Sequence, residues 1–308
     1  MHVAVVCYVG LLDQSIVMSL ILKLAGQLPH SWVYLFARIR SHRPWIKKAT
    51  DWIPDRLRDR EGVIQSGAGR GLKFCAGGSA AGFLLGTHDP SIQRALTTLV
   101  KPGMVVYDVG ANVGFTAMIA ARLVGAGGRV ICFEPQPGCS NVLRLNASLN
   151  GFSHVMLRAE ALGDSDGSAL FVVSENSTFS HLAAVGDTGE ARGEIRVELR
   201  RLDTLLDGSG LPRPDLVKID VEGAELQVLA GAASMLRLLK PVVLIELHGT
   251  NDGVANCLSA AGYATHVVGS RDDIRAAHWN ALIVGVPRES DTLIDEIHRL
   301  TSPADLHE

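Results

Sequence analysis

The sequence predicts an α/β fold in which a mostly parallel sheet is covered by helices on both faces. From about residue 100, short apolar runs alternate with segments of helical periodicity. The apolar runs are continuous, which is typical of parallel strands that are buried on both sides. A turn of small residues, DVGANVG (108–114), joins the first of these runs to the first helix. Together these three observations favour an open sheet with a ligand site at one edge.

The strands and helices of this fold are predicted in 96–287. Strands are predicted where apolar runs occur, and helices where apolar residues recur at helical spacing, one beginning at Pro137-Gly138 and one ending at Gly262. The strands are 104–110, 129–135, 154–162, 216–220, 241–247, 263–269 and 280–286. The helices are 115–124, 138–149, 224–236 and 254–262. Residues 165–200 break the rhythm with two further strands around a polar loop, and 288–308 are predicted to be a C-terminal helix or tail.

Residues 1–95 are predicted to form a mostly helical N-terminal extension. This part is basic, holds three tryptophans and is broken by prolines. SWVYLFARIR (31–40) has apolar and basic residues at helical spacing, which suits either peripheral contact with a membrane or packing on the rest of the protein. The apolar stretches are shorter than the ~18 residues of a spanning helix. We also leave open whether Met1 or Met18 is the natural start.

The composition excludes several classes of protein. The chain has 308 residues, a net charge of −3, 47% hydrophobic residues and 20% charged residues. This is the composition of a globular protein, neither disordered nor basic enough for a typical nucleic-acid-binding protein. The five cysteines are scattered, without C-x-x-C spacing, which favours reduced cysteines in a cytoplasmic protein.

The turn at 108–114 and the acid that follows it predict a nucleoside site. A dinucleotide fingerprint, G-x-G-x-x-G, fails at two of its three glycines, and no Walker A sequence is present. Glycines at Gly110 and Gly114 let the backbone approach a ligand closely. Glu134 ends the second strand, where an acid of an open α/β sheet accepts hydrogen bonds from ribose hydroxyls.

Polar residues at two later strand ends are the candidates for chemistry. Lys218, Asp220 and Glu222 alternate in LVKIDVEG, so they share one face if the strand persists. Glu246 and His248 stand at the matching end of the next strand, so we expect Asp220, Glu222, Glu246 and His248 to meet in one cleft. Glu225, after them, is interpreted as a first-turn acid favoured by the helix dipole.

The order of these motifs resembles the FkbM family of class I methyltransferases. The resemblance covers roughly 95–285 and rests on VVYDVGANVGFT (105–116), GRVICFEPQPGCSNVLRLNASLN (128–150), LRAEALGDSDG (157–167), RRLDTLL (200–206), LVKIDVEGAELQVLAGA (216–232) and VVLIELHG (242–249). It implies a Rossmann-like fold with a seven-stranded sheet, and S-adenosylmethionine as cofactor. Asp108, Gly110, Asn112 and Gly114 would form the cofactor loop, Glu134 would hold the ribose, and Glu160, Ala161 and Asp164 would lie near the adenine. Asp220 would also contact the cofactor.

The same resemblance implies O-methylation of a sugar, glycolipid or secondary metabolite. An alcohol reacts in such a transfer once a base takes its proton, and Asp220, Glu222 and His248 are candidates for that base. Mg²⁺, which prefers oxygen ligands, could also be held by Asp220, Glu222, Glu246 and His248, and it could orient and acidify the hydroxyl. A nucleoside-binding module without catalysis is the competing hypothesis, and an NAD enzyme is a weaker one. Residues that select the acceptor are expected in the N-terminal segment and in 174–195.

Overall fold

The structure is a computed structural model that describes residues 61–77, 82–174, 181–182, 191–208, 210–290 and 293–302. The chain divides into two compact units between Pro90 and Ser91. The described part of the first unit contains two short antiparallel strands, β1 (Glu61–Val63) and β2 (Lys73–Cys75), and the short helix α6 (Gly82–Leu85). The predicted basic helix at 31–40 lies outside the described residues, so the helical extension and its membrane contact stay predictions.

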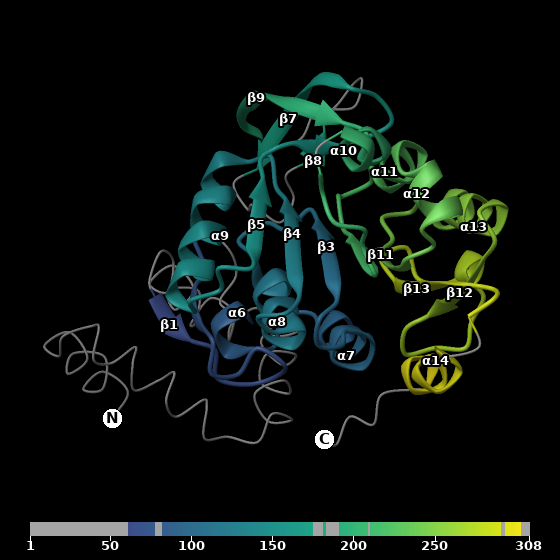
Figure 1. Ribbon diagram of the computed structural model, residues 1–308, viewed down its shortest axis with the longest axis horizontal. Coiled ribbons are helices and arrows are strands. Elements are labelled where there is room, and N and C mark those ends of the chain that lie inside the picture. The colour runs from purple at the N-terminus through teal and green to yellow at the C-terminus, as the bar shows by residue number, and fades with distance from the viewer. Residues whose placement is uncertain are drawn as a thin grey trace, which may run out of the picture. The chain divides into compact units, whose positions relative to one another are not determined.

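The second unit is built on the seven-stranded sheet that was predicted. The strand order is β12-β13-β11-β10-β3-β4-β5, and β3, β4 and β5 lie next to one another in Figure 1. All neighbouring strands are parallel except at β13, which pairs antiparallel with β11 and β12. The strands are β3 (Val105–Val109), β4 (Arg129–Phe133), β5 (Val155–Arg158), β10 (Leu216–Ile219), β11 (Val242–Glu246), β12 (Tyr263–Val267) and β13 (Leu282–Pro287).

Helices cover both faces of this sheet, as predicted. Alternate residues of the central strands, such as Tyr107, Ile131 and Val217, join one buried core with residues of α10 to α13. Helix α8 contacts β3 and β4. The helices are α7 (Pro90–Leu99), α8 (Phe115–Val124), α9 (Pro137–Leu149), α10 (Leu202–Gly208), α11 (Glu225–Gly231), α12 (Ala233–Leu238), α13 (Asn251–Ala260) and α14 (Ile294–Thr301). None of the helices in the described ranges has the length and apolar character to cross a bilayer.

Two predicted elements are each divided in the structure. The strand predicted over 154–162 is β5 followed by β6 (Ala161–Leu162), which belongs to a different sheet. The helix predicted over 224–236 ends at Gly231, and α12 begins two residues later. A Cβ atom at Gly231 would lie 1.9 Å from the carbonyl oxygen of Gly163. The glycine that permits this close packing is also a weak helix former, which accounts for a break that the apolar periodicity did not reveal.

The segment that breaks the strand–helix rhythm forms a small second sheet. β7 (Gly167–Ser174) and β9 (Ala191–Arg200) pair antiparallel, and with β6 and β8 (His181–Leu182) they form four strands in the order β6-β9-β7-β8. Figure 1 shows β7 and β9 beyond the carboxyl ends of β3 and β4. The two predicted strands are therefore confirmed, and most of 174–195 lies outside the described residues.

The topology fixes where a ligand can bind. From β3 the chain proceeds to β4 and β5 on one side, whereas β10 and β11 lie on the other side. Ligands of open α/β sheets bind beyond the carboxyl ends of the strands at the position where the strand order reverses. Here that position lies between Val109 at the end of β3 and Ile219 at the end of β10.

Candidate functional site

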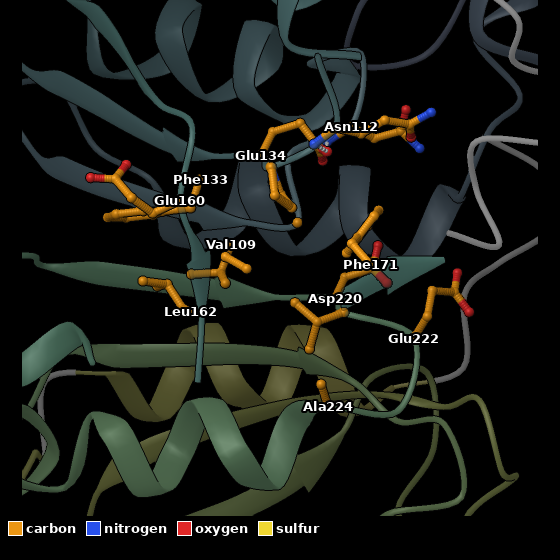
Figure 2. A pocket seen from close by; sticks show the side chains of 15 residues that line it. Val109, Asn112, Phe133, Glu134, Glu160, Leu162, Phe171, Asp220, Glu222 and Ala224 are labelled. Atoms are coloured by element: carbon orange, nitrogen blue, oxygen red, sulfur yellow. Dashed lines mark hydrogen bonds between the residues drawn. The ribbon is translucent and has the colours of Figure 1, made fainter. Parts of the chain in front are cut away.

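A pocket occupies this reversal point and collects most of the predicted cofactor residues. Gly110, Asn112, Glu134, Glu160, Ala161 and Asp220 all line it. Figure 2 shows Asn112 and Glu134 at one side of the pocket and Asp220 and Glu222 at the opposite side. The other three predicted cofactor residues do not line the pocket. Asp108 is buried in β3, Gly114 immediately precedes α8, and Asp164 is exposed.

Gly110 brings the loop against the neighbouring strand end. Its φ is +74°, and a Cβ atom at this position would lie 1.9 Å from the carbonyl oxygen of Asp220. Only glycine fits such an approach, since a side chain would meet backbone rather than a movable group. Asn112 is also left-handed, with φ of +50°, and its Oδ1 accepts a hydrogen bond from Val113 N at 2.8 Å. The close approach at Gly110 and the hydrogen bond of Asn112 both favour this conformation of the loop.

Asp108 and Lys218 form a buried ion pair under this loop. Lys218 Nζ lies 3.0 Å from Asp108 Oδ1 and 3.4 Å from Asp220 Oδ2, and it donates a hydrogen bond to Gly110 O at 3.0 Å. Burial alone would lower the pKa of Lys218, but the carboxylates of Asp108 and Asp220 raise it above its usual value. Burial raises the pKa of Asp108, and the ammonium group opposes that rise. Asp108 thus supports the loop through Lys218, a contribution that sequence reasoning did not assign.

Glu134 is a buried carboxylate that faces the loop. Its Oε2 accepts a hydrogen bond from Asn112 N at 2.9 Å, and its Oε1 accepts one from Gln136 N at 2.8 Å. Burial raises the pKa of Glu134 to about 7, against the lowering effect of the two backbone hydrogen bonds. Each carboxylate oxygen keeps a second lone pair, so the group can accept two further hydrogen bonds, as a ribose diol requires.

Apolar side chains line the pocket between these polar ends. Phe133 comes from the end of β4, whereas Leu162 of β6 and Phe171 of β7 come from the small sheet. Glu160 stands at the same wall, and Arg158 Nε donates a hydrogen bond to its Oε1 at 3.1 Å. The sequence predicted two strands within 165–200 but did not indicate that Phe171 reaches this pocket. The residue pattern along β7 does not indicate which of its faces lines a pocket, because the sequence does not show which other strands β7 pairs with.

Three of the four predicted catalytic side chains meet beside the pocket. One ligand atom from each of Asp220, Glu222 and His248 lies within 4.8 Å of the other two. His248 Nε2 is 3.5 Å from Glu222 Oε2 and 3.9 Å from Asp220 Oδ1. The predicted alternation along the strand is not what joins them, because β10 ends at Ile219 and Glu222 sits in a turn with φ of +50°. This turn directs the carboxylate of Glu222 toward His248.

Glu225 holds His248 from behind. It is fully buried at the first turn of α11, and its Oε1 lies 2.9 Å from His248 Nδ1 while its Oε2 accepts a hydrogen bond from Thr250 Oγ1. The predicted first-turn position is confirmed, but the helix dipole is not its principal partner. Burial lowers the pKa of His248, while the hydrogen bond to Glu225 and the charges of Glu222 and Asp220 raise it, to about 9 overall.

Glu246 stands apart from this group. It ends β11 and is paired in register with Leu282 of β13, and within the described ranges it neither lines the pocket nor belongs to the group of three. Its charge raises the pKa of Lys218. Glu246 therefore neighbours the buried ion pair, and a catalytic role for it stays a prediction.

Comparison with known proteins gives a match to one family profile and to several methyltransferases. The profile of the methyltransferase FkbM domain matches residues 108–276, more than half of the 308 residues. The hexuronic acid methyltransferase AglP of Haloferax volcanii is 31% identical over 182 residues, which cover 58% of this chain and 71% of that protein. The 2-O-methyltransferase NoeI of Sinorhizobium fredii is 28% identical over 171 residues, covering 51% of this chain and 69% of NoeI.

A much larger protein also shares the domain. The AMB antimetabolite synthetase AmbE of Pseudomonas aeruginosa is 31% identical over 191 residues, which are 50% of this chain but 9% of AmbE. The similarity therefore concerns the domain on the seven-stranded sheet and not the whole of every relative.

Proposed function

The chain belongs to the FkbM family of S-adenosylmethionine-dependent methyltransferases, and on that premise we propose that it methylates a hydroxyl group of a small-molecule or glycan acceptor. The observation that carries the proposal is the meeting of the glycine loop, Glu134 and the Asp220–Glu222–His248 group around one pocket. AglP and NoeI are named for a hexuronic acid acceptor and for 2-O-methylation. The name of AglP gives an acidic sugar as its acceptor, and the name of NoeI gives transfer to an oxygen. Together they support an oxygen of a sugar-type acceptor here.

The residues present fit the cofactor. Gly110 leaves room for a ligand close to the backbone, Glu134 can accept ribose hydroxyls, and Phe171 adds an apolar wall. S-adenosylmethionine, when bound, supplies a reactive methyl group on a positively charged sulfonium. Asp220 and Glu222 place negative charge at the pocket, which favours a cation there.

His248 is the base that we propose. Its Nδ1 is held by the buried Glu225, and its Nε2 faces the side chains of Asp220 and Glu222. A carboxylate behind the imidazole fixes the ring and stabilises the imidazolium that forms when the acceptor hydroxyl gives up its proton. The chain contributes alignment in addition, because the transfer needs the acceptor oxygen in line with the methyl group.

Binding of a divalent cation is an alternative role for Asp220, Glu222 and His248. Two carboxylates and an imidazole whose other nitrogen is held by Glu225 are a donor set that a metal could use. Methyl transfer should be lost in EDTA and restored by Mg²⁺ if a cation takes part. Full turnover in EDTA would remove this alternative.

The proposal is tested by calorimetric titration with S-adenosylhomocysteine. We expect micromolar affinity, about −8 kcal/mol, and at least a tenfold loss in Glu134→Ala. Glu289→Ala, which removes an exposed carboxylate paired with Lys240, is the matched control and should bind normally. Absence of binding to the folded wild type would refute the proposal. Binding without formation of S-adenosylhomocysteine from any hydroxyl acceptor would instead favour a binding module without catalysis.

Glu134 should make cofactor affinity depend on pH. With a pKa of about 7, Glu134 is mostly protonated at pH 6, and it must lose that proton to accept two ribose hydroxyls. Affinity for S-adenosylhomocysteine should therefore rise about tenfold from pH 6 to pH 8, in proportion to the ionised fraction. Titrations at the two pH values measure this, and Glu134→Gln should bind weakly with a flat profile. A flat profile in the wild type would contradict the prediction.

Phe171 should contribute to the same affinity through apolar contact. Phe171→Ala is expected to weaken binding of S-adenosylhomocysteine about tenfold, equivalent to ~1.4 kcal/mol, because an apolar wall of the pocket is lost. Leu170→Ala changes the neighbouring, more exposed residue of the same strand and should leave affinity within about twofold, since alternate residues face opposite sides. Equal effects in the two variants would show that Phe171 acts through the small sheet rather than through the pocket.

A further inference from the structure

Trp279 is a large aromatic side chain left open to solvent beside the proposed base. It is 58% exposed, although tryptophan ordinarily buries much of its large surface. Its ring centroid lies 6.3 Å from that of His248, with the two rings at 61°. The two rings are thus in an edge-to-face arrangement, and part of the indole surface faces solvent.

The backbone holds Trp279 in place. Gly249 N donates a hydrogen bond to Trp279 O at 2.8 Å, and Leu247 N donates one to Ala281 O at 3.0 Å. These bonds bracket His248 and extend the pairing of β11 with β13 beyond the end of the strands. The turn itself is closed by the bond from Ala281 N to His278 O at 3.0 Å. The paired backbone therefore fixes the main chain of Trp279 next to that of His248.

The indole stands next to the reacting side of the cofactor pocket. His248 Nε2 lies 3.5 Å from Glu222 Oε2, and Glu222 lines that pocket. An acceptor hydroxyl that reaches His248 would bring the remainder of its molecule over the neighbouring surface. Trp279 is an exposed aromatic side chain at that surface, and the ring of the exposed His278 lies beside it with the centroids 5.9 Å apart.

We propose that Trp279 forms an acceptor subsite, on which the C–H face of a pyranose ring stacks while one ring hydroxyl points to His248. The inference rests on the proposed function and names the acceptor class more closely. The indole face is electron-rich and attracts the weakly positive C–H groups of a sugar face, and its rigid ring loses little entropy on binding. The rim hydroxyls of the sugar would find acceptors in Glu222 and Asp220, which lie next to His248.

The experiment uses the full chain with saturating S-adenosylhomocysteine and the methyl glycoside of glucose as probe, an uncharged pyranose that the carboxylates of Asp220 and Glu222 do not repel. Saturation-transfer NMR detects weak binding and reports which ring protons contact the protein. We expect transfer to the C–H protons of one ring face in the wild type and in Trp279→Phe, and at least about a fivefold loss in Trp279→Ala. Leu238→Ala, which removes another exposed apolar side chain, is the control and should behave as the wild type.

The outcomes separate this inference from the proposed function. Cofactor affinity equal to wild type in Trp279→Ala shows that the fold and the cofactor site are intact, so a selective loss of sugar contact supports the subsite. Normal cofactor binding without sugar contact in the wild type overturns the subsite while the methyltransferase proposal stands. A change of oligomeric state in Trp279→Ala, seen by sedimentation velocity, would overturn it too, because the indole would then belong to a protein interface.

Discussion

Replacing Lys218 by methionine should destabilise the protein by about 3 to 5 kcal/mol, because it leaves a buried carboxylate without its counter-charge. Asp108 is buried under the cofactor loop, and neither of its oxygens accepts a well-aligned hydrogen bond from the described residues. The ammonium group of Lys218, whose Nζ lies 3.0 Å from Asp108 Oδ1, balances the negative charge of this buried carboxylate. Methionine has a similar volume and is apolar, so packing is largely retained and the cost is electrostatic. Denaturant unfolding with a constant m-value measures it.

A second consequence concerns the cofactor loop. Lys218 also donates a hydrogen bond to Gly110 O, and Gly110 is in close contact with the backbone of Asp220. Loss of the ammonium should therefore weaken binding of S-adenosylhomocysteine even at temperatures where Lys218→Met is folded. The destabilisation should also be smaller at pH 5 than at pH 8, because burial raises the pKa of Asp108 and a protonated Asp108 needs no counter-charge.

Two further variants test whether the loss of stability in Lys218→Met comes from the buried ion pair with Asp108. Lys240→Met removes an ion pair with the exposed Glu289 and should cost less than about 1 kcal/mol. Asp108→Asn combined with Lys218→Met removes both charges and should recover a large part of the lost stability, since the two residues are in contact. Equal costs for Lys218→Met and Lys240→Met, or additive effects in the double variant, would show that the buried pair is not a unit.

The sequence allowed the sheet, its helices and the pocket at the reversal point to be predicted, because each depends on local patterns. Continuous apolar runs identify buried strands, and a glycine loop followed by an acid at the next strand end identifies a nucleoside site. Gly110 and Glu134 do line a pocket at the reversal point, and their contact with the cofactor stays a prediction. The charge of Lys218 within an apolar strand was also visible, but a single sequence does not say which acid pairs with it.

The contributions that escaped prediction depend on contacts between elements far apart in the chain. Glu225 has the sequence context of an ordinary helix start, and only the packing of α11 against the residues after β11 makes it the partner of His248. Phe171 reaches the pocket because the small sheet lies over it. Glu246 was expected in the same cleft as His248, yet the two side chains differ in surroundings because the strand ends between them. The periodicity of a sequence predicts which face of a strand or helix a side chain occupies, but it does not predict which residues of other elements the side chain contacts.

Replacing His248 by asparagine should lower the rate of methyl transfer by about 10²- to 10⁴-fold, the usual contribution of a general base. Affinity for S-adenosylhomocysteine should change little, since His248 does not line the cofactor pocket. Formation of S-adenosylhomocysteine with saturating acceptor and cofactor measures the rate. His298→Asn, which changes an exposed histidine of α14, is the control and should retain wild-type rates.

The pH dependence of that rate distinguishes His248 from the acids beside it. The pKa of His248 is about 9 in the ligand-free protein, so the imidazole carries a proton at neutral pH and must lose it before it can act. The rate should therefore rise with pH across the neutral range, and the positive sulfonium should place its midpoint below 9, because a nearby cation disfavours the imidazolium. Glu225→Gln removes a charge that raises the pKa of His248 and should move the midpoint further down.

A carboxylate base ionises near pH 4 in ordinary surroundings and would give a rate that is level from pH 7 to 9. A level profile, with His248→Asn still active, would therefore assign proton removal to Asp220 or Glu222 and leave His248 as the ion-pair partner that holds their side chains at the pocket.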